Sequence, residues 1–184
     1  LMVSWSDLLM SAIAEATERF DLAEQRRAHP GSDLMSKLVQ TEIDGRHLTN
    51  EELGAFFVLL SVAGKDITQN TISLTAMALQ DHPEQRALLA EDFDGRIKSA
   101  VEEFVRFASP VMTFRRTAAR DTSIRGQEIK AGEWVMLMYS SANRDERAFA
   151  NPATFDITRS PNPHMAFGGG GPHFCLGAHI ARVE

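Results

Sequence analysis

Cysteine is almost absent from this sequence: Cys175 is the only one in 184 residues. A single thiol can form neither an intrachain disulfide nor a metal site made of four cysteines. It can still present one thiolate to a metal centre or to an electrophile. The surroundings of Cys175 in the chain therefore decide what the residue does.

Three further absences narrow the class of protein. The 19 basic and 25 acidic residues give a net charge of −6, and the basic stripe of a nucleic-acid binder is missing. The most apolar stretch, Ala55–Ala63, is far shorter than the roughly 20 residues that cross a bilayer. The first residues lack the basic region and cleavage site of a secretory signal. We therefore expect a cytoplasmic protein with no membrane span and no nucleic-acid partner.

Length and composition are ordinary. A chain of 184 residues with 43% hydrophobic and 24% charged residues is typical of one globular domain or of part of a larger one. A helix that begins near Cys175 would reach Glu184 without a stop signal. We expect residues 1–184 to be a partial single domain from inside a longer protein.

Apolar periodicity predicts that most of the chain is helical. The longest helix opens with the capping box Thr49-Asn-Glu-Glu52 and continues to about Gln80. Thirty helical residues span roughly 45 Å, long enough to cross a domain. The other predicted helices cover residues 5–28, 33–40, the segment from Pro83, 95–107 and the segment from Cys175 onward.

The pattern changes after Pro110. A glycine turn lies between short β-like runs in residues 124–129, and Trp134–Tyr139 is a compact apolar strand. Residues 143–163 are rich in proline and predict a loop. The predicted fold is mainly α with a small β insertion.

The strongest functional signal is the glycine-rich segment Phe167-Gly-Gly-Gly-Gly-Pro-His-Phe-Cys175-Leu-Gly177. Glycines let a backbone approach a flat partner more closely than other residues do. If Cys175 is an axial thiolate on a haem iron, Gly177 lets the next helix pass close to the porphyrin. The first amides of that helix would stabilise the charge on sulfur, and His173 could donate to a haem propionate.

Other roles for this segment stay open. A lone cysteine is most often a buried, chemically inert residue. A phosphate-binding loop is weakly supported, because no Gly-Lys-Ser/Thr follows the glycines. Zinc could use His173, Cys175 and His179, but a fourth ligand is missing nearby.

Two weaker patches accompany the cysteine. Glu103 and Arg106 are three apart on a predicted helix and can pair, although most pairs of this kind are exposed and contribute little. Ala63-Gly64-x-Asp66 lies inside the long apolar helix. An acid beside a glycine there often marks an opening for water or ligand, and the alternative is an acid on a solvated face.

Together, and in this order, the three patches resemble the cytochrome P450 family, in its soluble bacterial branch. The cysteine segment resembles the haem-binding signature, Glu103 and Arg106 the Glu-x-x-Arg pair, and Ala63–Asp66 the long distal helix. Further similar segments are Ser109-Pro110-Val111, Asn143-Arg144-Asp145 and Phe155-Asp156-Ile157. The chain resembles about the C-terminal half of such a protein.

The resemblance implies a bound haem b. Cys175 would be the iron ligand, and its thiolate would push electron density toward O–O cleavage. Arg115 and His173 would hold the propionates. The other positions that match residues around the haem are Ala63, Gly64, Phe167, Gly168 and Gly177.

The resemblance also implies roles away from the cysteine. Ala63, Gly64 and Asp66 would flank dioxygen, with Asp66 and Thr68 as catalytic residues, and residues 111–114 would line a wall of the substrate pocket. The structural residues would be Glu103, Arg106 and a third arginine. Many family members keep that arginine just before the position of Phe155. Thr154 stands there, so Arg159 is the expected substitute.

Two positions depart from the usual family pattern. Phe167 lies eight residues before Cys175, and Gly168 occupies the usual phenylalanine position, as in a bacterial branch with a longer glycine loop. Ile67 follows Asp66 where a threonine usually helps deliver protons to iron-bound dioxygen. Thr68 lies a further ~100° around the helix. A substrate hydroxyl, an ordered water or uncoupled turnover would have to compensate.

The activity implied is that of a haem-thiolate monooxygenase. It would insert one oxygen atom of O2 into an apolar substrate, such as a steroid or lipid, with electrons from a ferredoxin-type redox partner. Two alternatives stay open. The chain could be a truncated fragment with no activity of its own, or a haem-binding sensor or peroxygenase-like protein.

Overall fold

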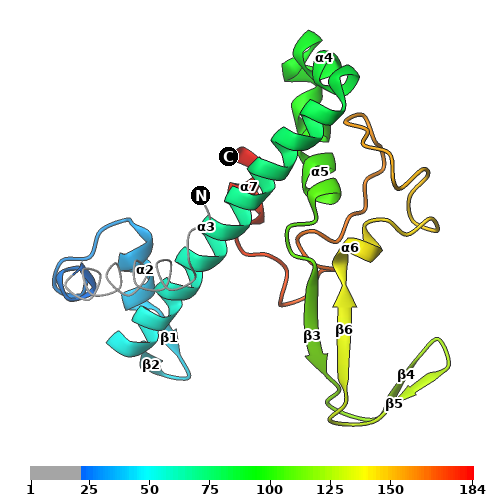
Figure 1. Cartoon of the computed structure of the whole chain (residues 1–184). Coiled ribbons are helices and arrows are strands. Elements are labelled where there is room, and N and C mark those ends of the chain that lie inside the picture. The colour runs from blue at the N-terminus through cyan, green and yellow to red at the C-terminus, as the bar shows by residue number, and fades with distance from the viewer. Residues whose placement is uncertain (1–21) are drawn as a thin grey trace. The chain divides into compact units, whose positions relative to one another are not determined.

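A computed structural model describes residues 22–184 of the chain (Figure 1). Within it the chain divides into two compact units, with the boundary between Asp66 and Ile67. Of the helix predicted for residues 5–28, residues 22–28 are helical, and residues 5–21 lie outside the described part.

The first unit is built on a short helix and a hairpin. Helix α2, Leu34–Gln40, begins after Asp33, whose carboxylate accepts a hydrogen bond from the Ser36 N–H at 3.0 Å. Strands β1, Glu42–Ile43, and β2, Arg46–His47, pair antiparallel around the predicted turn at Asp44 and Gly45. Both turn residues have positive φ, at 52° and 77°. The buried core of this unit is Ala23, Met35, Val39, Leu53 and Phe57.

Helix α3, Asn50–Asp81, confirms the predicted long helix. Its capping box forms as predicted. The Glu52 N–H donates to Thr49 Oγ1 at 3.2 Å, and the Thr49 N–H donates to Glu52 Oε2 at 2.9 Å. The helix stays continuous through Gly64 and across the boundary between the units. Within residues 22–184 no helix is long and apolar enough to span a membrane.

Two more helices follow α3 in the second unit. Helix α4, Pro83–Glu91, starts with the predicted proline, and α5, Phe93–Ala108, starts two residues before the predicted helix. Helix α5 ends at Ser109, which takes the left-handed conformation with φ 43° and ψ 56°. The core beneath these helices consists of Ala78, Leu89, Ala100, Phe155 and Ile157.

The β insertion is small and antiparallel. Strand β3, Thr113–Thr117, pairs with β6, Trp134–Met138, and β4, Thr122–Ile124, pairs with β5, Gln127–Ile129. The predicted glycine turn is confirmed, with Arg125 and Gly126 at φ 50° and 82°. Strand β6 ends one residue early because Tyr139 begins the short helix α6, Tyr139–Ala142. Figure 1 shows β3 and β6 side by side, with the β4–β5 hairpin at one end of the pair.

The rest of the second unit is irregular up to its last helix. Residues 143–177 form loops and turns, as predicted for 143–163. Helix α7, Ala178–Val183, begins three residues after Cys175, with Gly177 as its N-cap. A fold that is mainly α with a small β insertion is confirmed.

Candidate functional site

Glu103 and Arg106 form a fully buried ion pair on α5, each with a relative exposure of 0%. The contact is bidentate, because Arg106 Nε donates to Glu103 Oε2 and Nη2 donates to Oε1, both at 2.7 Å. The sequence alternative of an ordinary exposed pair is therefore wrong. A bidentate arginine–carboxylate pair fixes geometry as well as charge.

Arg106 of this pair also holds the loop that follows α6 through hydrogen bonds to backbone carbonyls. Arg106 Nη1 donates to the carbonyls of Asn143 at 2.7 Å and Pro152 at 2.9 Å. Arg106 Nη2 also donates to the Thr154 carbonyl at 3.0 Å. Two buried charges thus hold a segment more than thirty residues away in sequence. A buried ion pair is stable only when such additional hydrogen bonds satisfy it.

Arg159, the arginine expected to join the pair, lies beside it. Its Nε donates to Glu103 Oε2 at 3.1 Å, and the Asp156 N–H donates to Glu103 Oε1 at 2.9 Å. Arg159 Nη1 also donates to the Ala150 carbonyl at 2.7 Å. The Glu103 carboxylate therefore receives two arginines from two segments, together with a backbone amide.

Asn143 links this network to the cysteine loop, which we define as residues 167–177. It is fully buried, and its Nδ2 donates to Ser109 Oγ at 2.9 Å. Its Oδ1 accepts from the Met165 N–H at 2.6 Å. In the sequence, Asn143 stands out only as part of a segment similar to the family, because nothing local to it predicts contacts 34 and 22 residues away.

The cysteine loop closes on itself at its two ends. The Cys175 N–H donates to the Phe167 carbonyl at 2.9 Å, and the Gly168 N–H donates to the Met165 carbonyl at 2.9 Å. Gly168, Gly170 and Gly171 have φ of 91°, 90° and 78°, which a residue with a Cβ rarely adopts. The glycines are thus required by the path of the backbone. That path fixes where Cys175 leaves the loop.

The thiol of Cys175 is exposed. The alternative of a buried, inert cysteine is therefore wrong. A Cβ added to Gly177 would meet no atom within 4 Å, so open space lies over the start of α7. The neighbouring residues in the sequence include three exposed apolar side chains, Phe174, Leu176 and Ile180. A thiol among exposed apolar groups is typical of a surface that binds an apolar partner.

A second charged group that no sequence pattern predicts lies against the cysteine loop. It consists of Glu102, His164 and Arg182, and we call it the Glu102 cluster. His164 Nε2 is 2.7 Å from Glu102 Oε2, and Arg182 Nη2 donates to the same oxygen at 3.1 Å. The Arg182 guanidinium lies over the Phe167 ring, 4.4 Å from its centroid. The three residues lie on α5, the segment before the loop and α7, so no local pattern connects them.

The pKa values in the Glu102 cluster are shifted by its contacts. Burial acts to raise the pKa of Glu102, but the hydrogen bonds from Arg182 and His164 outweigh it and the pKa is lowered. The pKa of Arg182 is raised, first by its hydrogen bond to Glu102 and against the effect of burial. The negative charges of Glu102 and Cys175 add to that rise.

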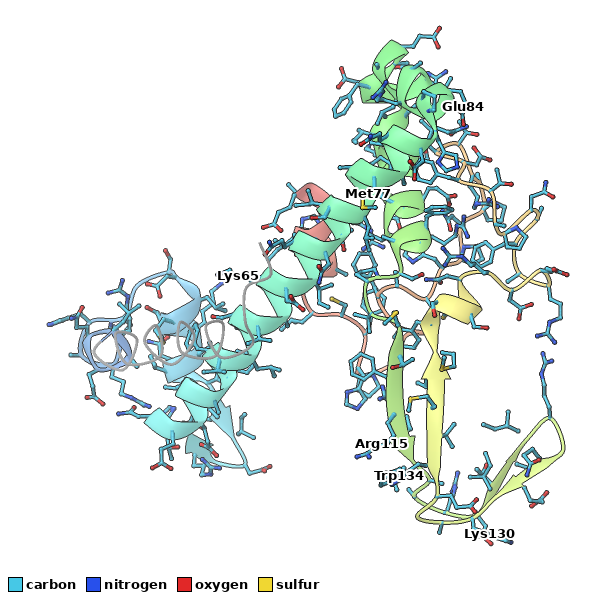
Figure 2. The ribbon with its side chains drawn as sticks, in the orientation of Figure 1. Lys65, Met77, Glu84, Arg115, Lys130 and Trp134 are labelled. Atoms are coloured by element: carbon cyan, nitrogen blue, oxygen red, sulfur yellow. The ribbon has the colours of Figure 1, made fainter. Side chains whose placement is uncertain are left out.

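The two expected propionate ligands differ in their surroundings. Arg115 lies on β3, and its guanidinium stacks 4.1 Å from the centroid of the Trp134 ring (Figure 2). Within the described chain, the Arg115 side chain forms no hydrogen bond or ion pair, so its charge is free for an anionic group. His173 lies in the cysteine loop and is exposed.

The predicted distal residues lie on α3 at the boundary between the units. Ala63 and Gly64 are exposed, and Asp66, Ile67 and Thr68 are partly buried. Asp66 ends the first unit and Ile67 begins the second. Because Asp66 and Thr68 are two residues apart on one helix, their side chains point about 200° apart. The residue directly after Asp66 is Ile67, whose side chain has no hydroxyl.

The structure supports neither the zinc site nor the phosphate-binding loop as an alternative role for the cysteine loop. In the part of the chain that the structure describes, no three His, Cys, Asp or Glu side chains come together to hold a metal ion. The zinc set of His173, Cys175 and His179 is therefore not assembled. The phosphate-loop alternative lacks a preceding strand, since residues 143–166 contain none.

Comparison with known proteins decides the family. The profile of the cytochrome P450 family matches residues 3–184. The chain belongs to the cytochrome P450 family. This confirms the resemblance inferred from the cysteine loop, the Glu103–Arg106 pair and the long helix.

Bacterial cytochromes P450 are among the similar proteins. The methyl-branched lipid omega-hydroxylase of Mycobacterium tuberculosis is 53% identical over 163 residues, which is 89% of this chain and 38% of that protein. The steroid C26-monooxygenase of Rhodococcus jostii is 47% identical over 165 residues, or 90% of this chain and 34% of that protein. A Mycobacterium marinum cytochrome P450 solved with pseudoionone has a TM-score of 0.87 at 56% identity, covering 94% of this chain and 41% of that one.

The chain thus spans 38% of the length of the lipid hydroxylase it matches. The cytochrome P450 family implies a haem held by a cysteine thiolate, and the residues present fit that group. Cys175 offers an exposed thiol, and Gly177 leaves open space beside it. Arg115 offers a cation without an anionic partner in residues 22–184, as a propionate requires.

Proposed function

We propose that this chain provides the thiolate-ligand side of a haem-thiolate monooxygenase, with Cys175 as the iron ligand. The observation that carries the proposal is the exposed Cys175 thiol at the end of a closed glycine loop. The names of two relatives, a methyl-branched lipid omega-hydroxylase and a steroid C26-monooxygenase, support an oxygenase of apolar molecules. We extend to this protein a lipid or steroid substrate, O2 and a ferredoxin-type electron donor.

The residues of the proposed site have three roles: binding haem, holding the loop segments in place and transferring protons. Bound haem b supplies the activation of dioxygen. Cys175 would ligate its iron, and Arg115 and His173 would bind its propionates. The residues that would lie around the haem are Ala63, Gly64, Phe167, Gly168 and Gly177. Glu103, Arg106 and Arg159 keep the loop segments in place through the contacts given above. Asp66 and Thr68 handle protons on the distal helix.

The thiolate assignment is tested by absorption spectroscopy of the full-length gene product. When reduced under carbon monoxide, the protein should show the long-wavelength Soret band of a thiolate-ligated haem. The Cys175→Ser variant should lose that band. His179→Ala is the matched control: it removes a nearby candidate ligand of the zinc alternative and should leave the band unchanged. A parent protein without the shifted band would refute the assignment.

Ile67 favours a second candidate, a peroxygenase-like protein that does not need proton delivery to dioxygen. The side chain after Asp66 has no hydroxyl, and Thr68 faces another direction on α3. If proton delivery limits the protein, Ile67→Thr should raise the product formed per reductant consumed. Thr68→Val is the matched control and should not raise it. An unchanged ratio in Ile67→Thr would remove the argument from Ile67.

A further inference from the structure

The Glu102 cluster contacts the cysteine loop at Phe167, and the Glu103–Arg106 network does not include it. We propose that Glu102, His164 and Arg182 are positioning residues that hold the cysteine loop and set the electrostatic potential at the Cys175 sulfur. This inference rests on the proposed function, since it concerns a thiolate that ligates haem iron. None of the three residues touches the reacting atoms, so each acts through Cys175.

Hydrogen bonds fix the arrangement of His164. The Ala166 N–H is 3.2 Å from His164 Nδ1, and a backbone amide can only donate. Nδ1 therefore accepts, and in the neutral ring Nε2 carries the hydrogen that it donates to Glu102 Oε2 at 2.7 Å. The His164 side chain is only 4% exposed. It orients the Glu102 carboxylate through this hydrogen bond.

Glu102 in turn fixes Arg182. Arg182 Nε donates to Glu102 Oε1 at 2.5 Å, and Nη2 donates to Oε2 at 3.1 Å. This bidentate contact leaves Nη1 to donate to the Ala178 carbonyl at 3.1 Å, at the first residue of α7. The positive charge is therefore held in one place relative to the start of the helix.

Two connections run from Arg182 to Cys175. The guanidinium lies over Phe167, and the Phe167 carbonyl accepts from the Cys175 N–H at 2.9 Å. Ala178, whose carbonyl Arg182 contacts, donates its own N–H to the Cys175 carbonyl at 3.3 Å. The negative charge of Cys175 also helps to raise the pKa of Arg182, so the two groups lie within electrostatic reach.

The charges of the pair act on the sulfur with opposite signs. A cation near a metal site favours the reduced, more negative state, and an anion disfavours it. Removing Arg182 should therefore lower the reduction potential of bound haem. Removing the charge of Glu102 leaves the positive charge of Arg182 uncompensated and should therefore raise the reduction potential. A role in folding alone would not give opposite signs.

The experiment is a reductive titration of the haem-loaded, full-length gene product. Arg182→Gln should shift the potential negative, Glu102→Gln should shift it positive, and the double variant should lie between the two single variants. Arg182→Lys keeps the charge and should stay close to the parent. The control is Arg147→Gln, which removes an exposed arginine paired with Asp145 at 2.9 Å and should shift nothing. Shifts of the same sign, or none, would overturn the electrostatic part of the proposal.

A measurement without haem tests the positioning part. Amide hydrogen exchange in the haem-free protein reports whether the Cys175 N–H is held by the Phe167 carbonyl. Arg182→Gln should speed exchange in residues 167–175, and Arg147→Gln should not. Unchanged exchange would overturn the positioning role. A parent protein that lacks the thiolate band would instead refute the proposed function, and the exchange result would still stand.

Discussion

Arg106 shows how much one side chain organises in this protein. All five N–H groups of its guanidinium donate, to the two Glu103 oxygens and to the carbonyls of Asn143, Pro152 and Thr154. Lysine has three donors on a single nitrogen and cannot reproduce a planar fork. The position therefore requires arginine for its shape as well as for its charge.

Replacing Arg106 should be costly. Arg106→Lys leaves Glu103 buried with an incomplete partner, and breaking a buried pair in this way costs about 3–5 kcal/mol. Arg147→Lys is the matched control, since Arg147 is 69% exposed and pairs with Asp145 at the surface. It should change the free energy of unfolding by less than about 0.5 kcal/mol. Urea unfolding of the full-length gene product measures both, and equal midpoints would contradict the prediction.

The lowered pKa of Glu102 makes a prediction about acid. A carboxylate whose folded pKa lies below its ordinary value of 4.5 stabilises the fold at pH values above 4.5. That contribution falls as the pH drops from 4.5 through the folded pKa. The parent should therefore lose stability more steeply than Glu102→Gln, which does not titrate, as the pH falls below 4.5. Urea midpoints measured across this range provide the test, and parallel curves for the two proteins would refute it.

Residues with unusual local patterns were the ones that sequence could identify. Cys175 follows four glycines, and Glu103 lies one helical turn from Arg106, so both stand out without a structure. His164 and Arg182 do not, because they contact Glu102 across 62 and 80 residues. Their residue types are common and their partners are set by packing of α5 against two later segments. Their proximity can be seen only in the structure.

At the level of elements, α3 was predictable because its start carries its own signal. Thr49 and Glu52 satisfy each other's backbone amides, and apolar residues recur through the helix. Strand β3 was missed because its five residues, Thr113–Thr117, are all exposed and lack an apolar alternation. It forms through pairing with β6, about twenty residues later. The two-residue strands β1 and β2 are too short to carry a pattern.

The capping box can be tested by removing one hydroxyl. Thr49→Ala takes away the acceptor of the Glu52 N–H and should destabilise the start of α3 by about 1 kcal/mol. Ser73→Ala is the matched control, because Ser73 lies inside the same helix and bonds only to the Gln69 carbonyl. Its change should be close to zero or slightly stabilising. Hydrogen exchange at residues 50–53 is the measurement, and equal exchange in both variants would contradict the prediction.

At the scale of the whole molecule, the second unit leaves many large apolar side chains uncovered. Trp134 is 70% exposed, Leu176 is 82% exposed and Val183 is 77% exposed. Folded proteins rarely expose so many without a partner, ligand or further chain to cover them. The chain also spans only 38% of the length of the lipid hydroxylase it matches. We therefore expect that the second unit alone does not enclose a haem.

Residues 1–184 alone should therefore bind hemin weakly. We expect a hemin titration to give no stable one-to-one complex and no thiolate-type Soret band after reduction under carbon monoxide. The full-length gene product is the positive control, and Cys175→Ser in the short chain is the negative one. Indistinguishable spectra for the short chain and its Cys175→Ser variant would support a non-catalytic piece. A stable stoichiometric complex that depends on Cys175 would instead mean that residues 1–184 are sufficient to hold haem.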